Sequence, residues 1–580
     1  MTNIDIVNFF IEPLSARQRQ YEAVRAIFVD KISYESISKK FGYKLSTLYS
    51  IVRNVKSGKL NLFPEVQKGP RQRITSKEIQ NRIINYRKRE NLSTIDISQK
   101  FKEEGINISQ KTIERILVDA GFKKLKRRTY KERGITPKGK IIPERSENLN
   151  FEELEPFKTD CPCAGAFLLL PYIIESDIID IVKKCKLPSS SVIGSTQACL
   201  SMLLLKLIGN ERLSNIGNYD QEPGLGIFAG LNILPKVTYM NTYSCRTSDE
   251  MLLDFQKQIL NKFKLNFSEL YGSDFINLDF HSIPHYGENI EMEKVWCGSK
   301  HTTMRGANTV FAQDTKNNMI LYTRADILRS EESEEIKKFV EYWREINGDV
   351  NETLVFDCKF TKYDVLNQLN KEGIKFITLK KRYYKLLQSV KLIPKEEWTK
   401  VFLNPPKRKH KKVSVHESEI TLGKCKEKIR QIIIKDHGRE QPTFIITNNG
   451  NLTIKQIVEV YAKRWRVENK LSELISFFNL NALSSPLMIR IHFDILWTFI
   501  ADSLYHIFAK DLRRFEHHDA KTIFKKFINM PGQVCYDGKS FAIKIRKRSH
   551  TPILKSVDKL KNPFVVPWLA NKKIEIIWTA

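Results

Sequence analysis

The stretch between residues 272 and 394 constrains the fold most, because its apolar pattern switches repeatedly between strand-like and helix-like periods. The expected order is three strands, a helix, a strand, a helix and a last strand, at residues 275–281, 309–312, 319–323, 331–343, 353–357, 362–369 and 375–379. This order is typical of a mixed α/β sheet. Further strand-like runs follow, which predict a β-rich insertion at residues 413–416, 420–422, 430–434 and 443–447.

The chain carries a large excess of positive charge. Its 580 residues include 96 Lys and Arg against 66 Asp and Glu, which gives a formal net charge of +30. Nucleic acid is the expected partner, because clustered cations release counterions from phosphates. We expect no membrane partner, since the longest apolar runs are too short to cross a bilayer and we see no signal peptide.

About half of the excess charge lies in residues 1–150, which hold 32 Lys and Arg against 16 Asp and Glu. Two similar three-helix patterns occur there, expected at residues 15–27, 34–41 and 45–55 and at residues 76–87, 93–101 and 109–120. In each pattern a short helix ends in Phe, a glycine follows, and a Ser- and Thr-containing helix comes next. This layout predicts a tandem helix-turn-helix whose last helix lies in the major groove, with an ordinary helical bundle as the alternative. The candidate DNA-contacting residues are Ser46, Thr47, Ser109 and Thr112.

Two further basic segments are candidates for contact with DNA phosphates. Arg127 and Arg128 belong to a run of cations that leads into a Gly- and Pro-containing linker. Such a linker can follow the DNA backbone or a minor groove, and a simple solvated linker is the alternative. Residues 541–548 have a strand pattern that places Lys544, Arg546 and Arg548 on one face, where they suit phosphate contacts.

These patterns predict a multidomain α and α/β protein with seven regions. They are a tandem helix-turn-helix region at 1–128, a basic linker at 129–148, a helical domain at 149–271, the first part of an α/β core at 272–394, a β-rich insertion at 395–450, the second part of the core at 451–512 and a C-terminal region with a basic strand at 513–580. The helical domain shows no chemistry beyond packing.

The run from Tyr461 to Glu468 is expected to lie on one helix. At about 100° per residue, Tyr461, Arg464 and Glu468 fall within roughly a 60° arc of one helix face. A phenol, a guanidinium and a carboxylate aimed together suit a site where a metal ion meets a phosphate. Arg and Tyr would hold the phosphate oxygens, and Glu would ligate the ion. A solvated charged face is the alternative.

Three carboxylates stand out by their location. Asp279 lies on the first strand of the α/β region, Asp357 ends a later strand, and Glu468 lies on the helix after the insertion. Acids that converge repel one another unless cations neutralise them, so the trio predicts two bound Mg²⁺ ions, for which Mn²⁺ can substitute. Other acids are expected to cap turns or face solvent instead, namely Asp274, Asp314, Asp326, Asp436 and Glu473.

Three sequence blocks resemble the catalytic blocks of bacterial insertion-sequence DDE transposases. They are Asn277-Leu-Asp279 with the residues up to 287, Val355-Phe-Asp357 with the residues up to 361, and the Tyr461, Arg464 and Glu468 signature. More narrowly, the chain is similar to the group with a Tyr-x2-Arg-x3-Glu signature and a β-strand insertion before the glutamate. The likeness covers roughly residues 270–510, and the short runs 228–235 and 547–552 also look like this group.

This resemblance implies an RNase H-like core that cuts transposon ends and joins the freed 3′-hydroxyl to target DNA. Asp279, Asp357 and Glu468 would carry the metals, and Tyr461 and Arg464 would grip the phosphates at the transposon end. It also implies a homodimer on paired inverted-repeat ends, in the bacterial cytoplasm and associated with the nucleoid. The implied partners are transposon-end DNA and target DNA.

One departure from the family pattern concerns the phosphate grip. The signature often continues with a Lys seven residues after the glutamate, where this chain has Ile475. A hairpin intermediate at the excised ends is therefore an open question, and Lys470 points to the opposite side of the helix. Two other functions stay open: a catalytically silent DNA-binding regulator derived from a transposase, and a site-specific metal-dependent nuclease that does not join ends.

Overall fold

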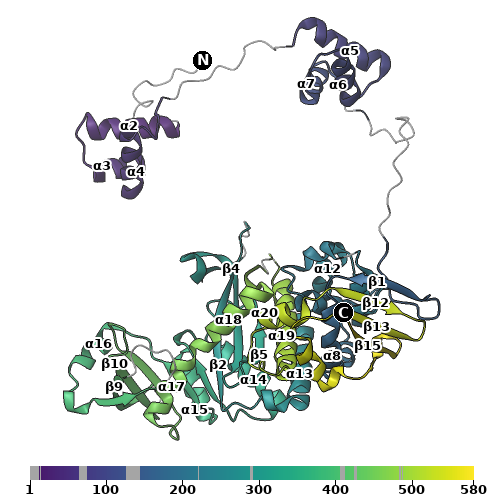
Figure 1. Ribbon diagram of the computed structural model, residues 1–580. Helices are drawn as coiled ribbons and strands as arrows, with labels where there is room; N and C mark the ends of the chain where they lie inside the picture. The colour runs from purple at the N-terminus through teal and green to yellow at the C-terminus, as the bar shows by residue number, and fades with distance from the viewer. Residues whose placement is uncertain are drawn as a thin grey trace. The chain divides into compact units, whose positions relative to one another are not determined.

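The computed structural model divides the chain into two compact units, Met1–Ile141 and Ile142–Ala580 (Figure 1). Each unit is described by itself below. Within these units the structure describes residues 12–13, 15–63, 75–123, 125, 144–219, 221–287, 292–404, 412–423, 427–482, 485 and 487–580.

The first three-helix group of the smaller unit comprises α2 (Ala16–Phe28), α3 (Tyr34–Phe41) and α4 (Leu45–Lys56). Ser15 and Ser33 begin α2 and α3 by accepting hydrogen bonds from backbone amides in the first turn. Gly42 ends α3 with φ +66°, a conformation that a residue with a Cβ rarely adopts. The apolar faces of the three helices enclose one small core. These bounds agree with the helices expected from the sequence.

The second group repeats this pattern with α5 (Lys77–Glu90), α6 (Thr94–Glu103) and α7 (Gln110–Asp119). Ser93 and Asp96 form a reciprocal capping box at the start of α6. Ile83, Ile97, Phe101 and Ile113 are fully buried at the centre of the group. Each group therefore has its own hydrophobic core, as the duplicated sequence pattern predicts.

The larger unit is built around a ten-stranded sheet, as far as the chain is described. The strand order is β3-β4-β2-β6-β7-β11-β10-β9-β8, and β5 pairs with β4 at one side. The bounds are β2 Phe275–Pro284, β3 Lys294–Cys297, β4 Thr302–Asp314, β5 Ile320–Arg324, β6 Thr353–Phe356, β7 Phe376–Leu379, β8 Thr399–Phe402, β9 Lys412–Thr421, β10 Lys428–Lys435 and β11 Thr443–Thr447.

The insertion strands do not form a separate layer. Strand β11 pairs antiparallel with β7, so β8 to β11 extend the same sheet that holds β2 and β6. The two strand-like runs expected at 413–416 and 420–422 are one continuous strand, β9, and β3 was not expected from the sequence. The helix α16 (Tyr384–Lys391) lies between β7 and β8 along the chain.

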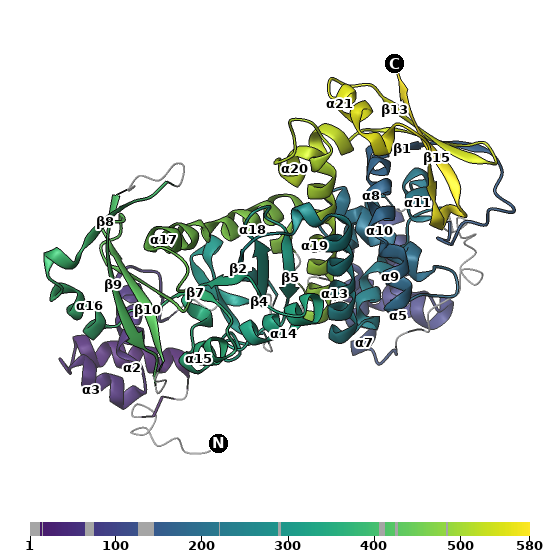
Figure 2. The same ribbon diagram turned by 90° about the horizontal axis from the view of Figure 1, so that it is seen from below.

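Helices cover both faces of the central strands (Figure 2). On β6, Leu354 and Phe356 join the main core, which includes side chains of α14 (Glu335–Asn347) and α15 (Tyr363–Lys371). Val355 points the other way, into a second core that includes Ile457 and Val458 of α17 (Ile454–Lys463). Alternate residues of β6 therefore face opposite helical layers.

The remaining part of the larger unit combines helices with a five-stranded sheet in the order β1-β12-β13-β15-β14 among the described residues. The long helix α19 (Met488–Lys510) is buried along most of its length. Its neighbours include α10 (Ser195–Leu207) and α13 (Asp249–Asn266). The sheet strands are β1 Phe157–Cys161, β12 Gly532–Tyr536, β13 Ser540–Arg546, β14 Phe564–Val566 and β15 Lys572–Thr579. Across the described residues, none of the helices combines the length and apolarity that a bilayer crossing needs.

Candidate active site

Asp279 and Asp357 lie side by side at the carboxyl ends of two parallel strands. Strands β2 and β6 pair in parallel, and the last pair in their register is Leu278 with Phe356. The next residues are Asp279, still within β2, and Asp357, one step beyond β6. Both aspartates follow a residue that faces the main core, so their side chains emerge on the opposite face. Neighbouring strands are about 4.8 Å apart, which brings the two carboxylates together.

The helical segment that carries the third acid is broken at Arg464. Helix α17 ends at Lys463, and α18 (Trp465–Phe478) begins directly after Arg464. The amide of Arg464 donates to the carbonyl of Tyr461 at 3.1 Å, and the amide of Val467 donates to the carbonyl of Arg464 at 3.0 Å. Both are hydrogen bonds between residues three apart, which is the pattern of the tighter 3-10 helix. The expectation of one continuous helix across this stretch was wrong, and Glu468 instead lies in the first turn of α18.

Arg464 connects two of the three acids. Its Nη1 donates to Oδ2 of Asp279 at 2.6 Å, and its Nη2 lies 3.3 Å from Oε1 of Glu468. The guanidinium also lies 5.9 Å from the ring centroid of Tyr461. Arg464 and Asp279 are 15% and 13% exposed, whereas Glu468 is 62% exposed. Glu468 is therefore the acid most open to a ligand.

Burial and charge act against each other at this site. Burial raises the pKa of Asp279, and the nearby Asp357 carboxylate raises it further, although Arg464 opposes both effects. Burial alone would lower the pKa of Arg464, but Asp279, Tyr461 and Asp357 together raise it. Burial also raises the pKa of the Tyr461 hydroxyl. Arg464 therefore stays cationic and Tyr461 stays a neutral hydrogen-bond donor at physiological pH.

A cavity of about 1200 Å³ opens at this edge of the sheet. Asp357, Tyr461, Arg464 and Glu468 line it. Its walls also carry the cationic residues Lys316, Arg382, Arg439 and Arg466. Arg382 follows β7, and Arg439 lies in the turn between β10 and β11, so the insertion supplies part of the wall. The cationic walls suit a polyanionic ligand. Metal ions that arrive with this ligand would offset the negative charge of the carboxylates.

The three acids could hold divalent metal. Carboxylate oxygens are the hard ligands that Mg²⁺ and Mn²⁺ prefer. A cation already lies among them, because the Arg464 guanidinium contacts both Asp279 and Glu468. This donor set fits the metal binding that the sequence predicts.

The predicted DNA-contacting residues of the smaller unit differ in their surroundings. Ser46 and Thr47 are exposed in the first turn of α4. Ser109 caps α7: its hydroxyl accepts from the Thr112 amide and lies 2.8 Å from the Thr112 hydroxyl. Both side chains of that pair are thus engaged in helix capping. Arg127 and Arg128 lie outside the described residues.

The predicted basic strand lies on the five-stranded sheet rather than at the cavity. Lys544 and Arg546 lie on β13, which ends at Arg546. Arg548 lies beyond the strand, where its Nη1 donates to the carbonyl of Asn529 at 3.0 Å. The strand is therefore shorter than expected, and none of the three residues lines the cavity of Asp357.

Two further groups of polar residues lie on the elements that carry the acids. His281 lies 2.7 Å from Oδ1 of Asn481, which connects β2 to the segment after α18. Glu473, expected to cap a turn or face solvent, belongs instead to a buried network with Lys470. The signal for that network was present as charged residues in an otherwise apolar helix, α19. Ile475 is partly buried against the main core.

The comparison with protein families identifies the region that holds this site. Residues 271–504 match the family described as Transposase DDE domain. This range contains Asp279, Asp357 and Glu468 together with the insertion strands. This part of the chain is therefore similar to the transposase DDE domain.

Several solved structures are similar to this chain. One is the cryo-EM structure of the piggyBac transposase synaptic complex with hairpin DNA, at 8% identity over 64% of this chain and 81% of that chain, with a TM-score of 0.34. Another is the Mos1 transposase paired-end complex with left transposon end, at 9% identity, 62% and 76% coverage and a TM-score of 0.13. A third is the crystal structure of the Mos1 strand transfer complex, at 10% identity over 64% of this chain and 78% of that chain, with a TM-score of 0.12. No curated protein matches the chain.

Proposed function

We propose that this chain is a DNA transposase that binds the inverted-repeat ends of an insertion sequence, cuts them and joins them to target DNA. One observation carries the proposal: Asp279 and Asp357, far apart in the sequence, lie at the ends of two paired strands, and Arg464 links Asp279 to Glu468. The match of residues 271–504 to the transposase DDE domain supports it. So does the cavity with cationic walls beside these acids.

Asp279, Asp357 and Glu468 are the residues that would hold the metal. When bound, two Mg²⁺ ions, or Mn²⁺ in their place, would neutralise charge on the reacting phosphate and polarise the attacking and leaving oxygens. The exposure of Glu468 leaves one side of the site open to a DNA strand. Asp279 and Asp357 are fixed by adjacent strands, so the two aspartates provide a rigid half of the site.

Arg464 and Tyr461 are the residues that we infer to bind DNA phosphates at the site. The guanidinium offers several donors in a fixed plane that matches phosphate oxygens. The Tyr461 hydroxyl keeps its proton because burial raises its pKa, so it can donate to a phosphate oxygen. Arg464 contacts Asp279 and Glu468, and we propose that DNA and metal binding redirect it toward the phosphate.

The rest of the molecule suits the same function. The antiparallel order β5-β4-β2 followed by the parallel strands β6 and β7 supports an RNase H-like core. We infer that the two three-helix groups are helix-turn-helix modules that read the transposon ends, with Ser46 and Thr47 exposed on the last helix of the first group. We also infer assembly as a dimer on paired ends, in a bacterial cytoplasm beside the nucleoid.

The test is cleavage of a labelled duplex that carries the DNA flanking the gene, with Mg²⁺ present. Asp357→Asn keeps the size of the side chain but removes a metal ligand, so we expect cleavage to fall by at least about a thousandfold while DNA binding is retained. Asp364→Asn is the matched control, because Asp364 is exposed on α15 and does not line the cavity. Normal cutting by Asp357→Asn would overturn the assigned site.

The same preparation separates a transposase from the two other functions. Pre-cleaved ends with a free 3′-hydroxyl are incubated with circular target DNA, and joined products are measured. A transposase gives joined products that require Asp357. Cutting without joining would indicate a nuclease, and specific binding without either reaction would indicate a DNA-binding regulator.

A further inference from the structure

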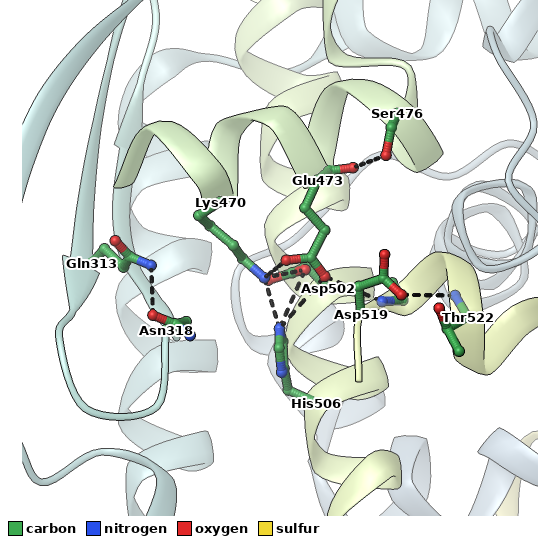
Figure 3. A network of polar contacts seen from close by, with 10 residues as sticks. Gln313, Asn318, Lys470, Glu473, Ser476, Asp502, His506, Asp519 and Thr522 are labelled. Carbon is green, nitrogen blue, oxygen red and sulfur yellow. Dashed lines mark hydrogen bonds and ion pairs between the residues drawn. The ribbon is translucent and has the colours of Figure 1, made fainter. Parts of the chain in front are cut away.

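A buried polar network joins α18, the helix that carries Glu468, to α19 (Figure 3). Lys470 of α18 donates through Nζ to Oδ1 of Asp502 at 2.7 Å and lies 2.7 Å from Nε2 of His506. It also donates to Oε2 of Glu473 at 3.3 Å. An ammonium group has three N–H donors, and here each of them meets one acceptor.

The network is deeply buried. Lys470 is 3% exposed and Asp502 is fully buried, while Glu473 and His506 are 16% and 13% exposed. Burial and the Lys470 charge lower the pKa of His506 to about 3, so the imidazole is neutral and Nε2 can accept from the ammonium. A buried charge without partners would cost several kcal/mol. The network therefore holds its members in one arrangement.

The same four residues argue against a metal ion at this point. Ligand atoms of Glu473, Asp502 and His506 lie within 4.8 Å of one another, which is close enough to share an ion. However, the Lys470 ammonium lies among them and bonds to each. The side chain supplies the positive charge that an ion would bring, so the cluster is an internal ion-pair lock.

The lock fixes α18 relative to two other helices. Asp502 and His506 belong to α19, and Oε1 of Glu473 accepts from the backbone amide of Ala520 at the start of α20 (Ala520–Ile523) at 3.1 Å. Lys470 follows Glu468 by two residues on α18 and so points about 160° away from it. The lock thus holds the helix that presents Glu468 to the cavity, and Lys470 and Glu473 also line that cavity.

We propose that Lys470, through its bonds to Asp502, Glu473 and His506, is the positioning residue that orients Glu468 toward Asp279 and Asp357. The proposal rests on the proposed function, because it assigns Glu468 as a metal ligand. Lys470 touches neither metal nor DNA in this scheme. It acts by fixing the rotation of α18 about its own axis and its position against α19. A rotation of α18 would move the Glu468 carboxylate away from the two aspartates.

The test compares Lys470→Met with Lys206→Met in the full-length chain. Lys206 is a matched control, because it is also a buried lysine that faces an α19 carboxylate, Asp494, at 3.9 Å, but it lies on α10. The double variant Lys470→Met/Glu473→Gln removes one positive and one negative charge together, and it replaces Lys470→Met if that variant does not fold. Two quantities are measured: Mn²⁺ affinity by titration, and amide hydrogen exchange across residues 465–472.

The expected result is that the Lys470 variant binds Mn²⁺ about tenfold more weakly and exchanges the α18 amides faster, while Lys206→Met matches the wild type in both. If Lys470 only stabilised the fold, the Lys470 and Lys206 variants would show the same Mn²⁺ affinity and the same α18 exchange when their thermal stabilities are similar. Unchanged α18 exchange in a folded Lys470 variant would overturn the proposal. If the wild type binds no Mn²⁺ through Glu468, the proposed function fails, and the exchange measurement still decides whether Lys470 fixes the helix.

Discussion

Arg464 donates a hydrogen bond to Asp279 at 2.6 Å, which links the break between α17 and α18 to the central strand β2. The same guanidinium reaches Glu468, so one side chain bridges two acids that the proposal assigns to metal binding. The positive charge of this bridge offsets the repulsion between the two acids. It also means that the residue proposed to hold DNA phosphate lies between two of the proposed metal ligands.

Replacing Arg464 with Ala should destabilise the larger unit. Asp279 would keep its burial but lose its cation, and breaking a largely buried pair costs about 3 kcal/mol. The measurement is the free energy of unfolding in urea. Arg344→Ala is the control, because the Arg344–Glu372 pair is 36% and 30% exposed, and its loss should cost less than about 1 kcal/mol. Equal losses in both variants would contradict a special role for the Arg464 bridge.

Replacing Tyr461 with Phe should affect cleavage more than stability. The ring and its packing against the second core are retained, while the hydroxyl proposed to bind phosphate is lost. A hydrogen bond to a charged group is worth about 1.5–3 kcal/mol, so we expect cleavage to slow roughly 10- to 100-fold. Single-turnover cleavage of an end duplex measures this effect. Tyr363→Phe, a change away from the cavity, should leave the rate unchanged, and an unaffected rate in Tyr461→Phe would remove Tyr461 from the site.

The stability effect of Asp502→Asn should depend on pH. Burial raises the pKa of Asp502 from 3.8 to about 7, so its proton is held in the folded chain but not in the unfolded chain between these values. The stabilisation from Asp502 is therefore present at low pH and lost as pH rises through about 7. Asn cannot lose a proton, so Asp502→Asn should gain stability relative to the wild type between pH 5 and pH 8. Urea unfolding at both pH values tests this. The same difference in the free energy of unfolding between Asp502→Asn and the wild type at pH 5 and pH 8 would contradict the raised pKa.

Changing Ser46 and Thr47 to Ala should weaken discrimination between DNA sequences. Both side chains are exposed in the first turn of α4, and neither belongs to the core of its three-helix group. Loss of base-edge contacts worth about 1 kcal/mol or more should reduce the preference for end DNA over scrambled DNA by roughly fivefold or more. Fluorescence anisotropy at fixed salt measures both affinities. Ser57→Ala, beyond the end of α4, is the control, and an unchanged preference in the double variant would argue against this helix as the reading helix.

Much of the fold could be predicted because local patterns agree with the final structure. The helices of the smaller unit have clear capping residues, such as Ser15, Ser33 and Ser93, and the expected bounds match closely. Strands β6 and β7 are short apolar runs separated by the amphipathic helix α15, which is a strong signal for parallel pairing. The strand-end position of Asp357 followed directly from that pattern.

The remaining features depend on contacts between distant parts of the chain. The break at Arg464 was not predictable, because the sequence around it contains no proline or glycine and its pattern is compatible with one helix. The buried network around Lys470 also depends on the packing of α18 against α19. Helical spacing alone does not reveal a partner on another helix. Antiparallel pairing of β11 with β7, which joins the insertion to the main sheet, is likewise a long-range property.

The most direct test of the central claim is a Mn²⁺ titration of the full-length chain bound to an end duplex, followed by electron paramagnetic resonance. The account predicts two tightly bound ions per chain, and the loss of at least one in each of Asp279→Asn, Asp357→Asn and Glu468→Gln. Asp364→Asn should keep both ions. The same number of ions with the same affinity in the wild type and all three variants would contradict a metal site shared by these acids.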